Sequence, residues 1–157
     1  MIVWRLARKL FAPTPAEAYN GTGARLGGGR WNSRTIAMAY ASENAALAFA
    51  EYFANLPQTM APTDLQFFPA LVPDDCILPS PTLPTGWDAV PAGFVSAHFG
   101  DEWIASRASL ALIVPSVLVP NVNILINPAH DDFQRIVFQQ PIAFTFDQRF
   151  IAKSAPA

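Results

Sequence analysis

The second half of the chain is broken into short apolar runs, and this division most constrains the fold. The runs are rich in Val, Ile and Phe and cover residues 110–114, 123–126, 135–139 and 143–146. Runs this short predict strands, because helices in globular proteins usually need about ten residues or more. Proline and asparagine separate the runs and favour turns. Similar patterns predict further strands at 2–8, 36–41, 65–72 and 76–78.

The clearest helical pattern follows Ser42, which is expected to cap a helix that runs to about Leu56, before Pro57. Its expected apolar face carries Ala46, Phe49, Ala50 and Phe53 at helical spacing. Glu51 lies off that face. A second, short helix is expected at 100–107. Few helices and many short strands predict an α+β domain with mostly antiparallel strands.

Size and composition predict one domain over residues 1–157, with a core of about 2–150. The chain is 52% hydrophobic and 14% charged, so a sizeable core is available. The single cysteine, Cys76, excludes an intrachain disulfide. No apolar stretch approaches the ~20 residues of a membrane span, so we expect a cytoplasmic protein. His98 and His130 lack partners at metal-ligand spacing, and no metal site is expected.

The segment from Gly21 to Asn32, GTGARLGGGRWN, points to an anion site. Glycines let a backbone approach a ligand closely, arginine binds carboxylates or phosphates in a fork, and Trp31 offers a flat face for a ring. Residues 1–34 carry six basic residues against one acidic residue, a net charge of +5, while the rest carries four against eleven, a net charge of −7. A basic corner on an acidic protein indicates a local anion pocket and argues against direct nucleic-acid binding.

Known phosphate-binding motifs do not fit this segment. Arg30 and Trp31 stand where a Walker A motif needs Lys and Ser or Thr, and no helix is expected to follow as in a dinucleotide fingerprint. Pattern alone therefore indicates an anion or nucleotide pocket. On pattern alone, Glu51 also fits a solvated helix residue, Tyr40 and Trp31 fit core residues, and Ser116 fits a turn.

Several elements taken together resemble the RES-domain toxin family. They are GTGARLGGGRWN, AYAS at 39–42, AFAE at 48–51, LIVPS at 112–116, NILINPAH at 123–130 and FTFDQRF at 144–150. The resemblance runs from Arg5 to Phe150. It implies a fold like that of ADP-ribosyltransferase toxins, NAD+ as a substrate with no further cofactor, an Xre-type helix-turn-helix antitoxin as a partner, and a homodimer. One departure is Arg34-Thr35, where the family usually has a glycine.

The resemblance also implies a set of site residues. Arg30 would be the arginine of the NAD+ site, Tyr40 the aromatic that faces nicotinamide, Glu51 the glutamate and Ser116 the serine. Arg5 matches the early arginine of the family and joins Arg30, Trp31 and Tyr40 in the expected substrate-binding set.

These residue types suit cleavage of the nicotinamide–ribose bond, which passes through an oxocarbenium-like state that a nearby carboxylate stabilises. The expected activity is therefore NAD+ degradation with water or phosphate as the acceptor. One alternative is an ADP-ribosyltransferase that modifies a macromolecule, because the first chemical step is shared. A second alternative is a non-catalytic nucleotide-binding or interaction module.

Overall fold

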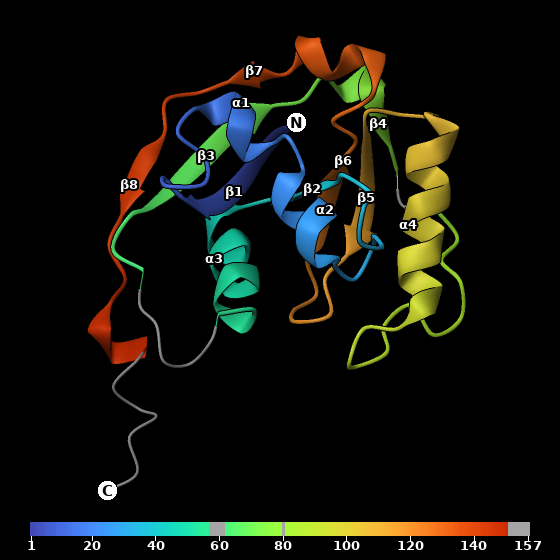
Figure 1. The fold of residues 1–157 in the computed structure, drawn as a ribbon, viewed down its shortest axis with the longest axis horizontal. Helices are drawn as coiled ribbons and strands as arrows, with labels where there is room; N and C mark the ends of the chain where they lie inside the picture. Colours follow the sequence, from blue (N-terminus) through green and yellow to red (C-terminus); the bar gives the residue numbers. More distant parts are fainter. Residues whose placement is uncertain (57–61, 80, 151–157) are drawn as a thin grey trace, which may run out of the picture.

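The computed structural model describes residues 1–56, 62–79 and 81–150. They form one eight-stranded, strongly curved sheet with the strand order β4-β5-β6-β2-β1-β3-β7, and β8 also pairs with β3 (Figure 1). Only the β4–β5 pair is parallel among the strand pairs of the described residues. The strands are β1 (Ile2–Arg8), β2 (Ala39–Ser42), β3 (Leu65–Leu71), β4 (Ile77–Leu78), β5 (Ala111–Pro115), β6 (Val122–Ile126), β7 (Val137–Phe138) and β8 (Ile142–Phe144).

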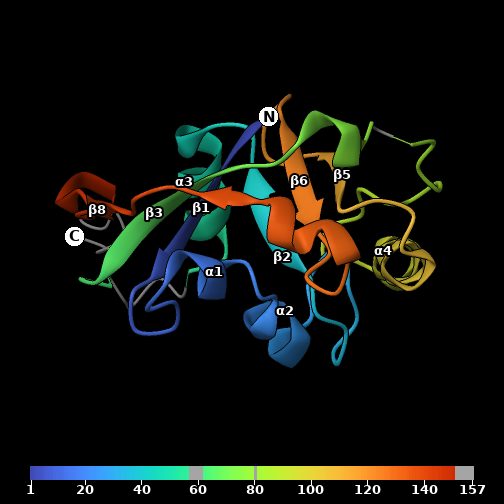
Figure 2. The same cartoon turned by 90° about the horizontal axis from the view of Figure 1, so that it is seen from above.

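Four α-helices and three short 3₁₀ turns accompany the described sheet. The α-helices are α1 (Pro15–Ala18), α2 (Thr22–Gly27), α3 (Ala45–Ala54) and α4 (Phe94–Ser106), and the 3₁₀ turns are Asp74–Cys76, Asp131–Arg135 and Gln148–Phe150. Helices α1 and α3 lie on opposite sides of β1 (Figure 2), and α4 lies beside β4 and β5 at one end of the sheet (Figure 1). None of the helices in these ranges is long and apolar enough to cross a bilayer.

Side-chain alternation along the strands divides the core between the two faces of the sheet. On one face, Val3, Ala39 and Ala41 pack with the fully buried Tyr19, which follows α1. On the other face, Tyr40 and its neighbours pack under Trp31 and α4, and Leu6 packs under α3. The residues of β2 therefore serve both cores, with Tyr40 on the side that α3 and α4 cover.

The central strands β1 and β2 meet at a single residue pair, Trp4 with Ser42. By contrast, β1 pairs with β3 over seven residues, and β2 pairs with β6 over four. The ladder between β1 and β2 therefore ends at Trp4, and the next residue of β1, Arg5, lies where the two strands separate. We call this separation the seam.

The predicted α+β class with mostly antiparallel strands is confirmed, and each predicted strand appears within a few residues of its expected place. No helix was predicted within the glycine-rich segment, but it contains α2. Helix α4 begins at Phe94 and is longer than the helix predicted at 100–107.

The helix after β2 begins and packs differently from the prediction. Its N-cap is Asn44, whose side chain accepts from the Leu47 backbone N at 2.8 Å, because Ser42 is still part of β2. Leu47 is buried, whereas Phe53 of the predicted buried face is exposed. Glu51 lies one turn after Leu47 and so faces the sheet. Pro57, the expected end signal, lies outside the described residues.

Candidate active site

The carboxylate of Glu51 reaches from α3 to the β5–β6 hairpin. Its Oε1 accepts hydrogen bonds from the Ser116 hydroxyl at 2.7 Å and from the Asn123 side-chain amide at 2.5 Å. Both donors are neutral, and no ion pair within the described ranges involves Glu51. Two neutral donors therefore hold the half-buried carboxylate in a fixed position, as a stabiliser of a developing cation must be held.

Ser116 follows β5 directly, and its hydroxyl both donates and accepts a hydrogen bond. It donates its only hydroxyl hydrogen to Glu51 and accepts from the backbone N of Leu118 at 3.0 Å. Its own backbone N donates to the Asn121 carbonyl at 2.9 Å, which closes the hairpin. Ser116 is thus the first neighbour of the carboxylate, as well as the turn residue that its sequence context also suggested.

Asn123 is a neighbour of Glu51 that the sequence reasoning missed. Its side-chain Oδ1 accepts a hydrogen bond from the Ser42 hydroxyl at 2.7 Å, while its amide nitrogen donates to Glu51 Oε1. The available signal was an amide in a strand of otherwise apolar residues, VNILI. Such a residue in a central strand usually has a specific partner, because an unpaired buried amide is costly.

Tyr40 lies on the same face of β2 as Ser42, about 7 Å away along the strand. Its hydroxyl donates to Asn32 Oδ1 at 2.7 Å and accepts from the Trp31 backbone N at 3.0 Å. A Cβ on Gly29 would lie 2.6 Å from this hydroxyl, so any other residue there would have to displace it. Burial raises the pKa of Tyr40 above its ordinary value. The hydroxyl is therefore neutral and already bonded, and the ring is the part of Tyr40 suited to a ligand.

The amide of Asn32 ties the glycine segment to Tyr40. Asn32 is 1% exposed, and its nitrogen contacts three backbone carbonyls, those of Ala24, Ser33 and Ile36, at 2.9 to 3.0 Å. One side chain thus connects α2, the following turn and the Tyr40 hydroxyl. The glycine-rich segment is therefore held in place next to the Tyr40 hydroxyl.

Arg5 lies at the seam between β1 and β2. Its Nη1 donates to the Tyr40 carbonyl at 2.6 Å, and its buried Nε has no hydrogen-bond partner among the described residues. Burial lowers the pKa of Arg5 below its ordinary value, although a guanidinium stays protonated at neutral pH. No carboxylate of the described residues pairs with it. An unneutralised, incompletely bonded guanidinium is suited to an anionic ligand.

Arg30 precedes Trp31, whose backbone N bonds the Tyr40 hydroxyl. Its Nη1 donates to the carbonyls of Trp87 and Ala89, at 2.9 Å each. The positive charges of Arg5 and Arg30 both oppose the rise in the pKa of Tyr40 that burial causes. No hydrogen bond within the described ranges joins Arg30 to Glu51 or Ser116. Arg30 therefore holds the 87–89 segment, and its bonded partners are not those of the carboxylate.

Trp31 does not provide the expected ring platform. It is 2% exposed, stacks on Trp87 with ring centroids 5.6 Å apart, and meets Phe99 edge-on at 6.0 Å. Protein therefore encloses the Trp31 ring, and the alternative that Trp31 is a core residue is correct. We therefore remove Trp31 from the substrate-binding set.

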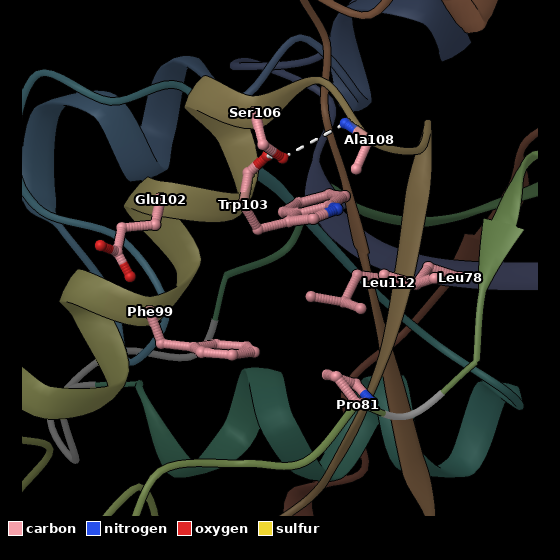
Figure 3. Close-up of a pocket in the computed structure, with 8 residues that line it drawn as sticks. All are labelled: Leu78, Pro81, Phe99, Glu102, Trp103, Ser106, Ala108 and Leu112. Carbon is pink, nitrogen blue, oxygen red and sulfur yellow. Dashed lines mark hydrogen bonds between the residues drawn. The ribbon is translucent and has the colours of Figure 1, made fainter.

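A cavity of about 300 Å³ lies elsewhere, between α4 and the β4–β5 edge (Figure 3). The side chains of Phe99 and Trp103, both from α4, point across it toward Leu112 of β5 (Figure 3). Its lining comprises Leu78, Pro81, Phe99, Glu102, Trp103, Ser106, Ala108 and Leu112. None of the candidate residues described above lines it, so we treat it as separate from the active site.

Comparison with known proteins assigns the family. A profile described as "RES domain" matches residues 2–147, nearly the whole chain. The chain belongs to the RES domain family. This RES chain is 38% identical to a protein of Sphingobium sp. (strain YBL2) named "Prs ADP-ribosylating toxin", over 96% of this chain and 97% of that protein. It is also 33% identical to "Toxin Res" of Yersinia enterocolitica, over 95% and 99% of the two chains. The RES chain described here is thus a toxin of that family.

A solved structure shares the fold. The RES chain matches a chain of the MbcT–MbcA toxin–antitoxin complex of M. tuberculosis with a TM-score of 0.71, covering 96% of this chain and 88% of that one. The sequences are only 16% identical. The likeness therefore supports the curved α+β fold, and the arrangement of the site rests on the contacts described above.

Proposed function

We propose that this RES toxin breaks the bond between nicotinamide and ribose in NAD+. The Glu51 carboxylate is the observation that carries this proposal, because it is charged, half-buried and fixed by two neutral donors. Departure of nicotinamide leaves positive charge on the ribose, and a preorganised carboxylate lowers the energy of that state. Nicotinamide leaves NAD+ as a neutral molecule, so the step needs no general acid. Metal ions and further cofactors have no part in the proposal.

The substrate is proposed to lie across the Tyr40 side of the sheet. The ring of Tyr40 stacks on nicotinamide, since its hydroxyl is already bonded to Asn32 and Trp31. Arg5 and Arg30, whose charges are not neutralised by ion pairs within the described residues, bind the diphosphate. Ser116 acts on the reaction through Glu51, because its hydroxyl hydrogen is given to the carboxylate.

The first proposed acceptor of ADP-ribose is water or phosphate. A second candidate is a macromolecule, which the name of the Sphingobium relative, "Prs ADP-ribosylating toxin", favours. The test is to incubate the purified chain with NAD+ alone, with phosphate and with purified Prs, and to separate the products. Free ADP-ribose or its phosphate supports the first acceptor. NAD+ loss that requires Prs, with ADP-ribose attached to Prs, supports the second acceptor. Intact NAD+ in all three mixtures refutes the cleavage reaction.

In cells, the proposed reaction makes this chain the toxic half of a toxin–antitoxin pair. We propose an Xre-type helix-turn-helix antitoxin as its partner, a homodimeric toxin, and action in the cytoplasm, where NAD+ is abundant. The structural likeness to MbcT from a toxin–antitoxin complex supports an antitoxin as the partner. Expression of the chain alone should arrest growth and deplete NAD+, and Arg30→Ala should relieve both effects. Arrest that persists in Arg30→Ala would contradict the assigned site.

A further inference from the structure

The orientation of the Asn123 amide is fixed by its two partners. Ser42 and Asn123 are directly opposite in the β2–β6 ladder, and the Ser42 hydroxyl meets Oδ1 of Asn123. A hydroxyl bonds to either end of an amide, but a carboxylate accepts only. The nitrogen must therefore face Glu51, and the oxygen must face Ser42.

This arrangement restricts the Glu51 side chain. A glutamate on a helix has several rotamers, and ordering such a side chain costs up to about 2 kcal/mol. Ser116 and Asn123 hold the same oxygen, Oε1, from two different elements, the β5–β6 turn and β6. No hydrogen bond of the described residues uses Oε2, so this second oxygen remains for the ribose side of the substrate.

A second asparagine–glutamate pair on the same hairpin provides an internal comparison. Asn121 donates its side-chain amide to Glu43 Oε1 at 2.7 Å, and the Val122 backbone N donates to the same oxygen at 2.9 Å. The two pairs have the same chemistry and lie two residues apart on the hairpin. Glu43, however, is bonded to a backbone N of the hairpin itself, so the side chains of this pair anchor the hairpin. Within the described residues, no hydrogen bond joins these two side chains to Glu51, Ser116 or Asn123.

We propose that Asn123 is a positioning residue for Glu51 and that Ser42 holds the oxygen end of its amide in place. The proposal rests on the proposed NAD+ cleavage. Asn123 acts through Glu51 and does not touch the substrate, so its loss should lower kcat and leave KM nearly unchanged. Its hydrogen bond to a charged group predicts a loss in kcat of about 10- to 100-fold.

The kinetic test compares Asn123→Asp with Asn121→Asp in the full chain. At pH 7.5, Asn123→Asp places a second carboxylate beside Glu51 and should lose kcat by the amount above, whereas Asn121→Asp should retain kcat. An aspartic acid regains a donor when protonated. The rate of Asn123→Asp relative to wild type should therefore recover as the pH falls toward 5. A wild-type kcat in Asn123→Asp, or an equal and pH-independent loss in both variants, would overturn the proposal.

A second measurement does not depend on turnover. In a ¹⁵N-labelled chain, Glu51→Gln should shift the side-chain amide resonances of Asn123 and leave those of Asn121 in place. Unchanged Asn123 resonances would overturn the proposal. A wild-type chain that leaves NAD+ intact would instead refute the proposed function, and the resonances would still decide whether Asn123 holds Glu51.

Discussion

Glu51→Gln separates the charge of the carboxylate from its geometry. A glutamine carbonyl accepts the same two hydrogen bonds, from Ser116 and Asn123, that Oε1 accepts in the wild type. The side chain should therefore stay in place, while the negative charge that stabilises the oxocarbenium-like state is lost. Removing one preorganised electrostatic group of this kind typically costs ~10²–10³-fold in kcat, or about 2.7–4 kcal/mol.

The thermal stability of Glu51→Gln should change little. Two opposing effects contribute to the free energy of unfolding. Hydrogen bonds to a neutral carbonyl are weaker than those to a carboxylate, but the substitution also removes the cost of desolvating a half-buried charge. A residual change of about 1 kcal/mol would move the Tm of a domain of this size by only ~2–4 °C.

The assay is release of nicotinamide from NAD+ by purified protein, together with a thermal melt of each variant. Glu43→Gln is the matched control, because Glu43 accepts the same kind of asparagine hydrogen bond but anchors the hairpin. Glu43→Gln should turn over NAD+ like the wild type. Near-normal turnover in a folded Glu51→Gln, or an equal loss in Glu43→Gln, would refute the reasoning about the carboxylate.

Substitutions at three further residues test the Tyr40 side of the site. Arg30→Lys should weaken the binding of NAD+ by about 1.5–3 kcal/mol and so raise KM, because a point charge does not replace a planar fork. An unchanged KM would remove Arg30 from the substrate-binding set. Tyr40→Phe should keep KM nearly normal but lower the Tm, because it leaves two hydrogen-bonding groups without a partner. Tyr40→Leu removes the ring and should raise KM. Equal KM values for the two variants would contradict a stacking role. Gly29→Ala should lower both Tm and turnover, because the new methyl group would meet the Tyr40 hydroxyl, and a variant with normal values for both would show that this contact relaxes easily.

Local patterns were sufficient to predict much of the fold. The strand at 2–8 matches β1 residue for residue, because alternation and flanking turns specify it locally. Helix α2 was missed, since glycine and threonine are poor helix formers and its Gly21 N-cap provides no side-chain hydrogen bond. The face of α3 was assigned wrongly because Phe49 and Phe53 have the stronger apolar signal. In the structure they stack on each other and meet aromatic residues near the end of the described chain.

The site could be predicted only as separate parts. Arg30, Tyr40, Glu51 and Ser116 came from the family resemblance, and the structure joins two of them, Glu51 and Ser116, by a hydrogen bond. That contact spans 65 residues of sequence, so no local pattern could reveal it. Asn123 was missed for the same reason, because its meaning depends on partners from α3 and β2 that only the folded sheet brings together.

The seam between β1 and β2 affects how inactive forms of this toxin should be chosen and interpreted. Arg5 holds the Tyr40 carbonyl where the ladder has ended, so the side chain offered to an anion also closes the sheet. Removing it leaves a backbone acceptor unpaired, at a cost of about 1–3 kcal/mol. Some Arg5 variants that restore growth will therefore do so because cellular proteases degrade the destabilised chain, and not because the folded chain is inactive. A harmless but fully folded reference protein, for use as an immunogen or as bait for the antitoxin, is better obtained through Glu51.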